Sequence, residues 1–195
     1  MLHVVEEPAP GGQAPPDIEA QLREVFGDDF GRVTVKQATS TEPAEAALFN
    51  PAFMAVLVAS SASDHQRVGA SDLPFPLAFL VAPLALHEGT RAALPGNITG
   101  RMSTWVLEHL LIAAELPLRA RSMVPYVREG LRYGLRAGDL TLVGGHLASP
   151  RRLQDDAAST TDDVRACIRA AAFAGRWFAR TGDARTIFGL LGVRP

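Results

Sequence analysis

The chain has 195 residues, 47% of them hydrophobic, and a formal net charge of −2 at pH 7. This hydrophobic content is sufficient for a core and argues against an intrinsically disordered chain, while the small net charge gives no overall attraction to nucleic acid or to an acidic membrane. The single cysteine, Cys167, excludes an internal disulfide and a cysteine-based zinc cluster.

The first part of the chain differs in composition from the rest. Residues 1–16 contain four prolines and two glycines, which predicts a flexible leader. Residues 17–44 form an extension whose order the sequence leaves open, with a short helix expected over 18–26 and a short strand over 32–38. No signal peptide is visible, and no apolar run reaches the roughly 18–20 residues of a membrane span. We therefore expect a cytoplasmic protein whose main domain covers residues 45–195.

The main domain begins with two apolar segments of different kinds. Helical spacing of apolar residues predicts a helix from residue 51 to about 66, with Asn50 as its cap and Pro51 in its first turn. The next segment, residues 73–87, is apolar on every side, so we expect it at the centre of the core. Pro83 should kink or restart this helix, because a proline inside a helix removes a hydrogen bond.

Two helices and a hairpin are expected next. Residues 103–116 have amphipathic spacing, and Pro117 should end this helix or start the next one. Residues 119–140 alternate arginine with apolar residues at helical spacing. Residues 139–150 contain two short β-prone runs around Gly144 and Gly145, a residue pair that favours a two-residue hairpin turn.

The last part of the chain is predicted to be helical again. Residues 151–160 are polar and predict a loop. Residues 161–180 predict a helix capped by Thr161, and residues 184–191 predict a short final helix that stops at Gly192. The sequence therefore predicts a predominantly α-helical α+β fold with a small β-hairpin, in an order compatible with a winged-helix arrangement.

The chain contains no recognised catalytic or nucleotide-binding motif. None of its five histidines pairs with another ligand at a known metal spacing, so we expect no metal and no cofactor. Cys167 lies on the apolar side of its helix and is interpreted as a buried, inert thiol. A hydrolase built around His146 or Glu129 is the weakest alternative, and we expect a protein that is not an enzyme.

Arginines are concentrated late in the chain, where residues 119–195 hold thirteen of the eighteen. At 100° per residue, arginines share one narrow stripe on each of two predicted helices. Guanidinium groups bind phosphates or acidic protein surfaces well, but a solvated face in an arginine-preferring sequence explains the same pattern. The candidate residues for DNA or an acidic partner are Arg121, Arg128, Arg132, Arg136, Arg165, Arg169, Arg176 and Arg180.

Four stretches together resemble the middle-component proteins of bacterial three-component ABC systems. They are ALFNPAF (47–53), LPFPLAFLVAPLALHEGTRAALP (73–95), AGRWFAR (174–180) and TIFGLLGVRP (186–195). The resemblance covers residues 45–195. It implies a non-enzymatic adaptor subunit that links an SMC/Rad50-like ABC ATPase to an effector, often a nuclease, in antiphage or anti-plasmid defence complexes related to Lamassu. DNA is a further candidate partner through the arginine stripes.

The C-terminal motif suggests a defined geometry in addition to core filling. Gly192 permits a left-handed turn, Pro195 fixes its own φ, and Arg194 would be presented as a fixed cation. We expect apolar residues of the last helix to close the core while Arg194 meets a partner or an internal carboxylate. The candidate partner-binding residues are Leu191, Gly192, Arg194 and Pro195, and the apolar residues expected in the core are Ile187, Phe188 and Leu191.

One alternative function stays open at this point. A stand-alone winged-helix DNA-binding regulator would also explain a helical domain with an arginine-rich helix before a hairpin. Residues 119–136 supply arginines but no asparagine or glutamine, the side chains that commonly read adenine. Sequence preference and a steep dependence of DNA affinity on salt would favour the regulator over the adaptor.

Overall fold

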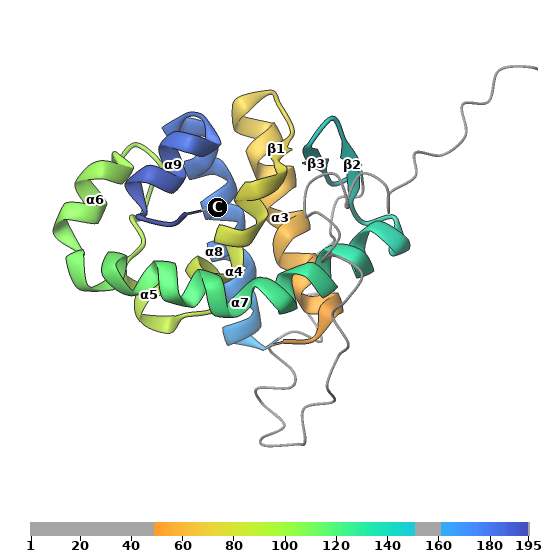
Figure 1. The fold of residues 1–195 in the computed structure, drawn as a ribbon, viewed down its shortest axis with the longest axis horizontal. Coiled ribbons are helices and arrows are strands. Elements are labelled where there is room, and N and C mark those ends of the chain that lie inside the picture. Colours follow the sequence, from red (N-terminus) through yellow and green to blue (C-terminus); the bar gives the residue numbers. More distant parts are fainter. Residues whose placement is uncertain (1–48, 151–160, 195) are drawn as a thin grey trace, which may run out of the picture. The chain divides into compact units, whose positions relative to one another are not determined.

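The computed structural model describes residues 49–150 and 161–194 (Figure 1). These residues belong to one compact unit that spans residues 36–195. The expectations for the leader, for the helix at 18–26, for the strand at 32–38 and for the loop at 151–160 lie outside the described residues. The elements in chain order are α3 (Pro51–Gly69), β1 (Leu73–Pro74), η2 (Phe75–Leu77), α4 (Ala78–Ala85), α5 (Glu88–Ala93), α6 (Met102–Glu108), α7 (Leu110–Ala137), β2 (Thr141–Val143), β3 (His146–Ala148), α8 (Asp162–Thr181) and α9 (Ala184–Leu190).

Helices α3 and α8 form the centre of the domain and share its most extensive contact (Figure 1). Both begin where the sequence predicts, at residues whose side chains satisfy a free backbone N–H group. The Asn50 side chain accepts a hydrogen bond from the N–H of Ala52 at 2.9 Å, and the Thr161 hydroxyl accepts one from Val164 at 3.4 Å. The predicted helices at 51–66 and 161–180 are therefore confirmed.

The apolar segment at 73–87 is buried as expected. Its core side chains in α4 lie against α7 and α8, and Leu80, Val81 and Leu84 are fully buried. The helix does not restart at Pro83, because it continues to Ala85. A proline in the last turn removes only one helical hydrogen bond, and the burial of its neighbours keeps the segment helical.

The helix boundary predicted at Pro117 is wrong. The break lies at His109, whose φ of −128° and ψ of 48° are not helical, and α7 then runs through both Pro117 and Pro125. The imidazole of His109 stacks on Trp105 with 5.2 Å between ring centroids, and its Nδ1 lies 2.9 Å from the Trp105 carbonyl oxygen. This contact with a buried tryptophan fixes the corner between α6 and α7, and the periodicity of the sequence does not show it.

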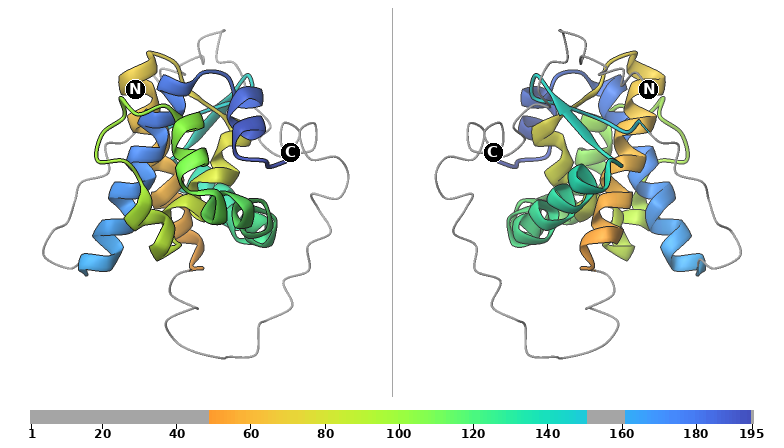
Figure 2. Two further views of the ribbon diagram at one scale, coloured as in Figure 1. Left: turned by 90° about the vertical axis from the view of Figure 1, so that its left-hand side faces the viewer. Right: turned by 90° about the vertical axis from the view of Figure 1, so that its right-hand side faces the viewer.

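The predicted hairpin is confirmed, and a third strand joins it. Gly144 and Gly145 form the turn with φ values of 56° and 75°, a conformation that glycine adopts without strain. Strand β1 pairs with β3 through Leu73 and Leu147, so the antiparallel sheet has the order β1–β3–β2. Figure 2 shows α7 leading directly into this hairpin. The resulting connectivity of helix, strand, helices and hairpin is compatible with a winged helix, and the fold is predominantly helical α+β as predicted.

One histidine is buried beside the sheet. His65 on α3 is 4% exposed, and its Nδ1 lies 2.9 Å from the carbonyl oxygen of Ser71, so the ring donates this hydrogen bond. Burial lowers the pKa of His65 below its ordinary value, more than the Ser71 carbonyl and Asp72 raise it. The folded protein therefore favours the neutral imidazole.

We expect the stability of the domain to decrease as the pH falls below about 6.5, the pKa of an unfolded histidine. Below that pH the unfolded chain binds a proton that the buried His65 resists, so the free energy of unfolding falls with pH. Urea denaturation at pH 7.5 and pH 5.5 measures the change. His65→Gln should reduce this dependence. A slope of stability against pH that is unchanged in this variant would contradict the assignment.

Candidate partner-binding surfaces

The apolar residues of the C-terminal helix close the core, as expected. Ile187, Phe188 and Leu191 are all buried, and α9 packs against α6 and α8. Helix α9 begins at Asp183, whose carboxylate accepts a hydrogen bond from the N–H of Thr186 at 2.7 Å. This bond is the largest cause that lowers the pKa of Asp183. The end of the described chain is thus part of the domain.

The turn after α9 has the geometry that the sequence predicts. Gly192 has a φ of 66°, in the left-handed region. Its N–H donates to the carbonyl of Gly189 at 3.3 Å, and the N–H of Val193 donates to the carbonyl of Phe188 at 3.0 Å. These are the two hydrogen bonds of a Schellman motif. Arg194 follows this fixed turn and is exposed, while Pro195 lies outside the described residues.

The four α7 arginines lie on one continuous helix but differ in exposure. Arg121 and Arg136 are exposed, whereas Arg128 and Arg132 are half-buried. The guanidinium of Arg132 pairs with the Glu129 carboxylate at 2.5 Å. Two of the four positions are therefore freely accessible to a partner, and their binding role stays a prediction.

The α8 arginines divide in the same way. Arg169 and Arg180 are exposed, and Arg165 pairs with Asp162 at 2.5 Å within its own helix. Arg176 instead forms an ion pair with Asp64 of α3. Its guanidinium also lies 5.9 Å from the centre of the Phe173 ring. Arg176 thus holds α8 against α3, a structural role that the stripe pattern alone does not distinguish from partner binding.

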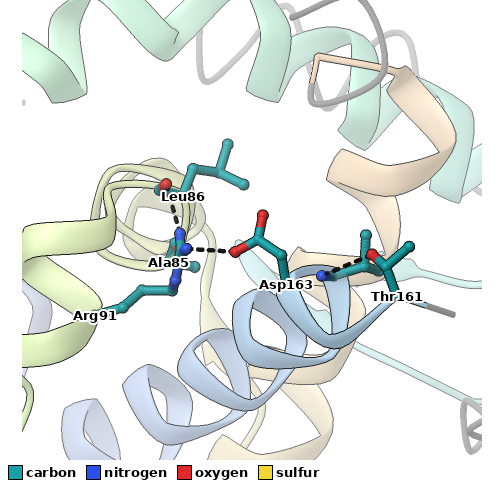
Figure 3. A network of polar contacts seen from close by, with 6 residues as sticks. Ala85, Leu86, Arg91, Thr161 and Asp163 are labelled. Atoms are coloured by element: carbon teal, nitrogen blue, oxygen red, sulfur yellow. Dashed lines mark hydrogen bonds and ion pairs between the residues drawn. The ribbon is translucent and has the colours of Figure 1, made fainter. Parts of the chain in front are cut away.

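Arg91 has a structural role that the sequence analysis missed. Figure 3 shows its guanidinium donating hydrogen bonds to the carbonyl oxygens of Ala85 at 3.1 Å and Leu86 at 2.6 Å, at the end of α4. The same group pairs with Asp163 of α8 at 2.6 Å. A cation at the C-terminal end of a helix donates hydrogen bonds to the last carbonyls and interacts favourably with the helix dipole. Only the tertiary structure brings these three segments together.

Replacing Arg91 with methionine should reduce the free energy of unfolding by about 1–3 kcal/mol, the cost of leaving two part-buried carbonyls without a charged donor. The Asp163 pair should contribute little to this loss, because that carboxylate is 64% exposed. Urea denaturation gives the difference. The control is Arg169→Met, at an exposed arginine, which should change stability by less than about 0.5 kcal/mol. Equal effects of the two substitutions would show that the Arg91 bonds do not stabilise the domain.

Arg119 is a second arginine with an internal role. Its guanidinium donates to Thr90 Oγ1 at 2.8 Å and to the carbonyl of Ile112 at 3.0 Å, joining α7 to α5. Burial lowers the pKa of Arg119. The high arginine content of the chain therefore reflects interior hydrogen bonding in part, and not only surface charge.

A further surface that the sequence analysis missed consists of exposed leucines around the corner between α6 and α7. We call it the leucine face, and its exposed fractions are 71%, 62%, 84% and 74%. The sequence analysis described residues 103–116 only as amphipathic and did not predict which side of the helix these leucines occupy. The break at His109 and the packing of α7 turn them outward. The leucine face consists of Leu107, Leu110, Leu111 and Leu118.

The candidate catalytic residues do not assemble into a site among the described residues. His146 is exposed on the hairpin with its Nδ1 2.9 Å from the carbonyl of Gly144, and Glu129 is engaged by Arg132. Cys167 is fully buried, and this burial raises the pKa of its thiol. The interpretation of Cys167 as an inert thiol is consistent with both observations.

The comparisons with known proteins identify the family. The model of the ABC-three component (ABC-3C) system Middle Component 3 family matches residues 38–195. The chain belongs to this family. The resemblance inferred from the four sequence stretches is therefore confirmed, and the match begins seven residues before the expected one. No curated protein and no solved structure matches the chain. Within residues 49–150 and 161–194, no helix has the length and apolar character needed to cross a membrane.

Proposed function

We propose that this middle component is a non-catalytic adaptor that links an SMC/Rad50-like ABC ATPase to an effector, often a nuclease, in an antiphage or anti-plasmid defence complex. The family is the middle component of a three-component system, and this membership supports partners within that system. The observation that carries the proposal is the leucine face, because an adaptor needs an apolar surface that becomes buried only when the complex assembles.

The leucine face has the properties of an unfilled protein interface. Each of its four leucines is more than half exposed, although burying one leucine stabilises a protein by roughly 1.5–3 kcal/mol. Large contiguous apolar patches are rare on monomeric proteins and mark interaction sites. Leu111 and Leu118 lie seven residues apart on α7, so both project from the same side of that helix. A partner helix with an apolar stripe fits this surface.

The test is co-purification of the tagged full chain expressed with its neighbouring genes, with mass spectrometry of the proteins that remain bound. We expect recovery of an ABC ATPase and of an effector. The double variant Leu111→Ser, Leu118→Ser should reduce recovery of at least one of them by tenfold or more. Val143→Ser is the matched control, since Val143 is 66% exposed but lies on the hairpin. It should retain full recovery.

Two outcomes would contradict the proposal at different levels. Recovery of both partners by the leucine variant at the unsubstituted level would show that the leucine face is not the docking surface. Absence of any ATPase or effector from the purified unsubstituted protein would contradict the adaptor function itself. Circular dichroism of the leucine variant separates lost docking from lost folding.

DNA binding is a second candidate, and it is favoured by the connectivity of the fold. The arginine-bearing helix α7 precedes the hairpin β2–β3, as a recognition helix precedes the wing of a winged helix. Tyr133 and Tyr126 are both exposed on the same helix, and Tyr126 also stacks on Phe49 with 4.2 Å between ring centroids. Measuring the affinity of the protein for a DNA duplex at salt concentrations from 50 to 200 mM tests this candidate.

The expected result depends on the two exposed α7 arginines. If Arg121 and Arg136 contact phosphates, changing each to alanine should make the slope of log affinity against log salt shallower by about 0.9. Arg185→Ala, at an exposed arginine of α9, is the control and should leave the slope unchanged. Duplex binding that does not respond to salt, or no binding at 50 mM salt, would exclude this candidate.

A further inference from the structure

A cleft with a volume of about 390 Å³ lies where three distant segments of the chain meet. Its walls come from the segment 98–103 that leads into α6, from the end of α8 and from α9. Helices α6 and α9 are in contact with each other (Figure 1). Clefts that bind small molecules typically have volumes of about 300–1,000 Å³. This cleft was not predicted from the sequence, because no motif links the three segments.

The cleft has a preformed floor. Trp177 and Met102 line it and are buried, and the indole Nε1 of Trp177 donates a hydrogen bond to the carbonyl oxygen of Gly100 at 3.0 Å. This bond ties the segment 98–103 to α8. The Thr181 hydroxyl, also in the lining, donates to the Trp177 carbonyl at 2.8 Å. The walls are therefore held together by bonds within the domain, and no large rearrangement is needed to form the cleft.

The charges of the cleft are unbalanced. Arg101 and Arg180 both line it, both are exposed, and neither forms an ion pair within the described part of the chain. No acidic residue is among the described residues of the lining. By contrast, Arg91 and Arg176 each have a carboxylate partner. Two cations in the lining without a described acid beside them favour the binding of an anion in this cleft.

We propose that this cleft binds a small phosphorylated ligand, with its phosphate at Arg101 and Arg180 and its remaining part between the segment 98–103 and the end of α8. The guanidinium fork matches the oxygens of a phosphate and forms two parallel hydrogen bonds with it. Ser103 adds a hydroxyl group to the lining, which suits a ligand with acceptor oxygens. The inference is independent of the adaptor function and of the leucine face.

The test uses the full chain and three probes at constant ionic strength: pyrophosphate, adenosine monophosphate and acetate. Trp177 lines the cleft and is one of only two tryptophans, so tryptophan fluorescence reports binding, with calorimetric titration as the second readout. We expect saturable binding of at least one phosphorylated probe and none of acetate. Arg101→Ala and Arg180→Ala should each weaken this binding about tenfold or more, the loss expected for a charged hydrogen-bond donor.

The control variant is Arg185→Ala, which removes an exposed arginine of α9 that does not line the cleft. It should bind within twofold of the unsubstituted protein. The proposal is overturned if no phosphorylated probe saturates, if acetate binds equally, or if Arg185→Ala weakens binding as much as Arg180→Ala. Binding of a single-stranded oligonucleotide without binding of either small phosphorylated probe would also overturn it, in favour of a nucleic-acid surface.

Discussion

Replacing Gly175 with alanine is expected to reduce the free energy of unfolding by about 3 kcal/mol or more. A Cβ atom at this position would lie 2.0 Å from the carbonyl oxygen of Ser61, across the contact between α8 and α3. The obstacle is backbone, so no side chain can move aside and the two central helices must separate. Urea denaturation followed by circular dichroism measures the loss.

Gly189 provides the matched control for this substitution. It also lies within a helix, but a Cβ there would meet no atom within 4 Å. Gly189→Ala should therefore stabilise the protein by up to about 1 kcal/mol, because alanine has the higher helix propensity. If Gly175→Ala unfolds at the same urea concentration as the unsubstituted protein, α3 and α8 are not as close as the structure places them.

Removing the last nine residues, 187–195, should abolish cooperative folding or leave a protein close to its stability limit. The deletion takes away the buried side chains of Ile187, Phe188 and Leu191, each worth roughly 1.5–3 kcal/mol. The sum is comparable to the whole stability of an ordinary domain, about 5–15 kcal/mol. Thermal unfolding monitored by circular dichroism and by tryptophan fluorescence checks this expectation.

The shorter deletion, of residues 192–195, distinguishes the role of the buried residues of α9 from the role of the exposed tail that follows them. It removes the two hydrogen bonds that Gly192 and Val193 donate at the end of α9, and the fold should survive with a loss of about 1–2 kcal/mol. If Arg194 contacts a partner, this deletion and Arg194→Ala should both reduce co-purification of the ATPase or effector. Arg185→Ala serves as the control on α9. An unfolded short deletion would contradict the division of roles.

Local signals in the sequence determined the helices that begin and end with strong caps. Asn50 with Pro51, Thr161, the Gly144–Gly145 turn and Gly192 all act on backbone groups within a few residues of themselves. Their effect does not depend on the rest of the fold. The burial of residues 73–87 was predictable for a related reason, since a segment that is apolar on every side has no face to present to water.

The tertiary structure alone decided the corner at His109 and the passage of α7 through two prolines. At the break His109 stacks on Trp105, and Trp105 is itself held by distant residues, the Ala93 carbonyl and the Trp177 ring. Helix α7 continues through Pro117 and Pro125, because tertiary packing can outweigh the loss of a helical hydrogen bond at a proline. The same holds for the arginines, whose stripes are periodic in the sequence although Arg176 faces Asp64 and Arg180 faces a cleft. Periodicity places a residue on one side of a helix, but it does not tell what lies opposite that side.

The candidate surfaces fall into the same two groups: some are set by residues close together in the sequence, and others are set by tertiary packing. The sequence by itself determined the family, the helical class and the turn that presents Arg194, because these depend on short motifs and caps. Only the tertiary structure decided that the leucine face points outward and that Arg101 and Arg180 share a cleft. The cleft forms where segments far apart in the chain meet, and such a meeting leaves no periodic mark on either segment. The leucine face lies within residues 107–118, and its exposure depends on the break at His109 and on the packing of α7.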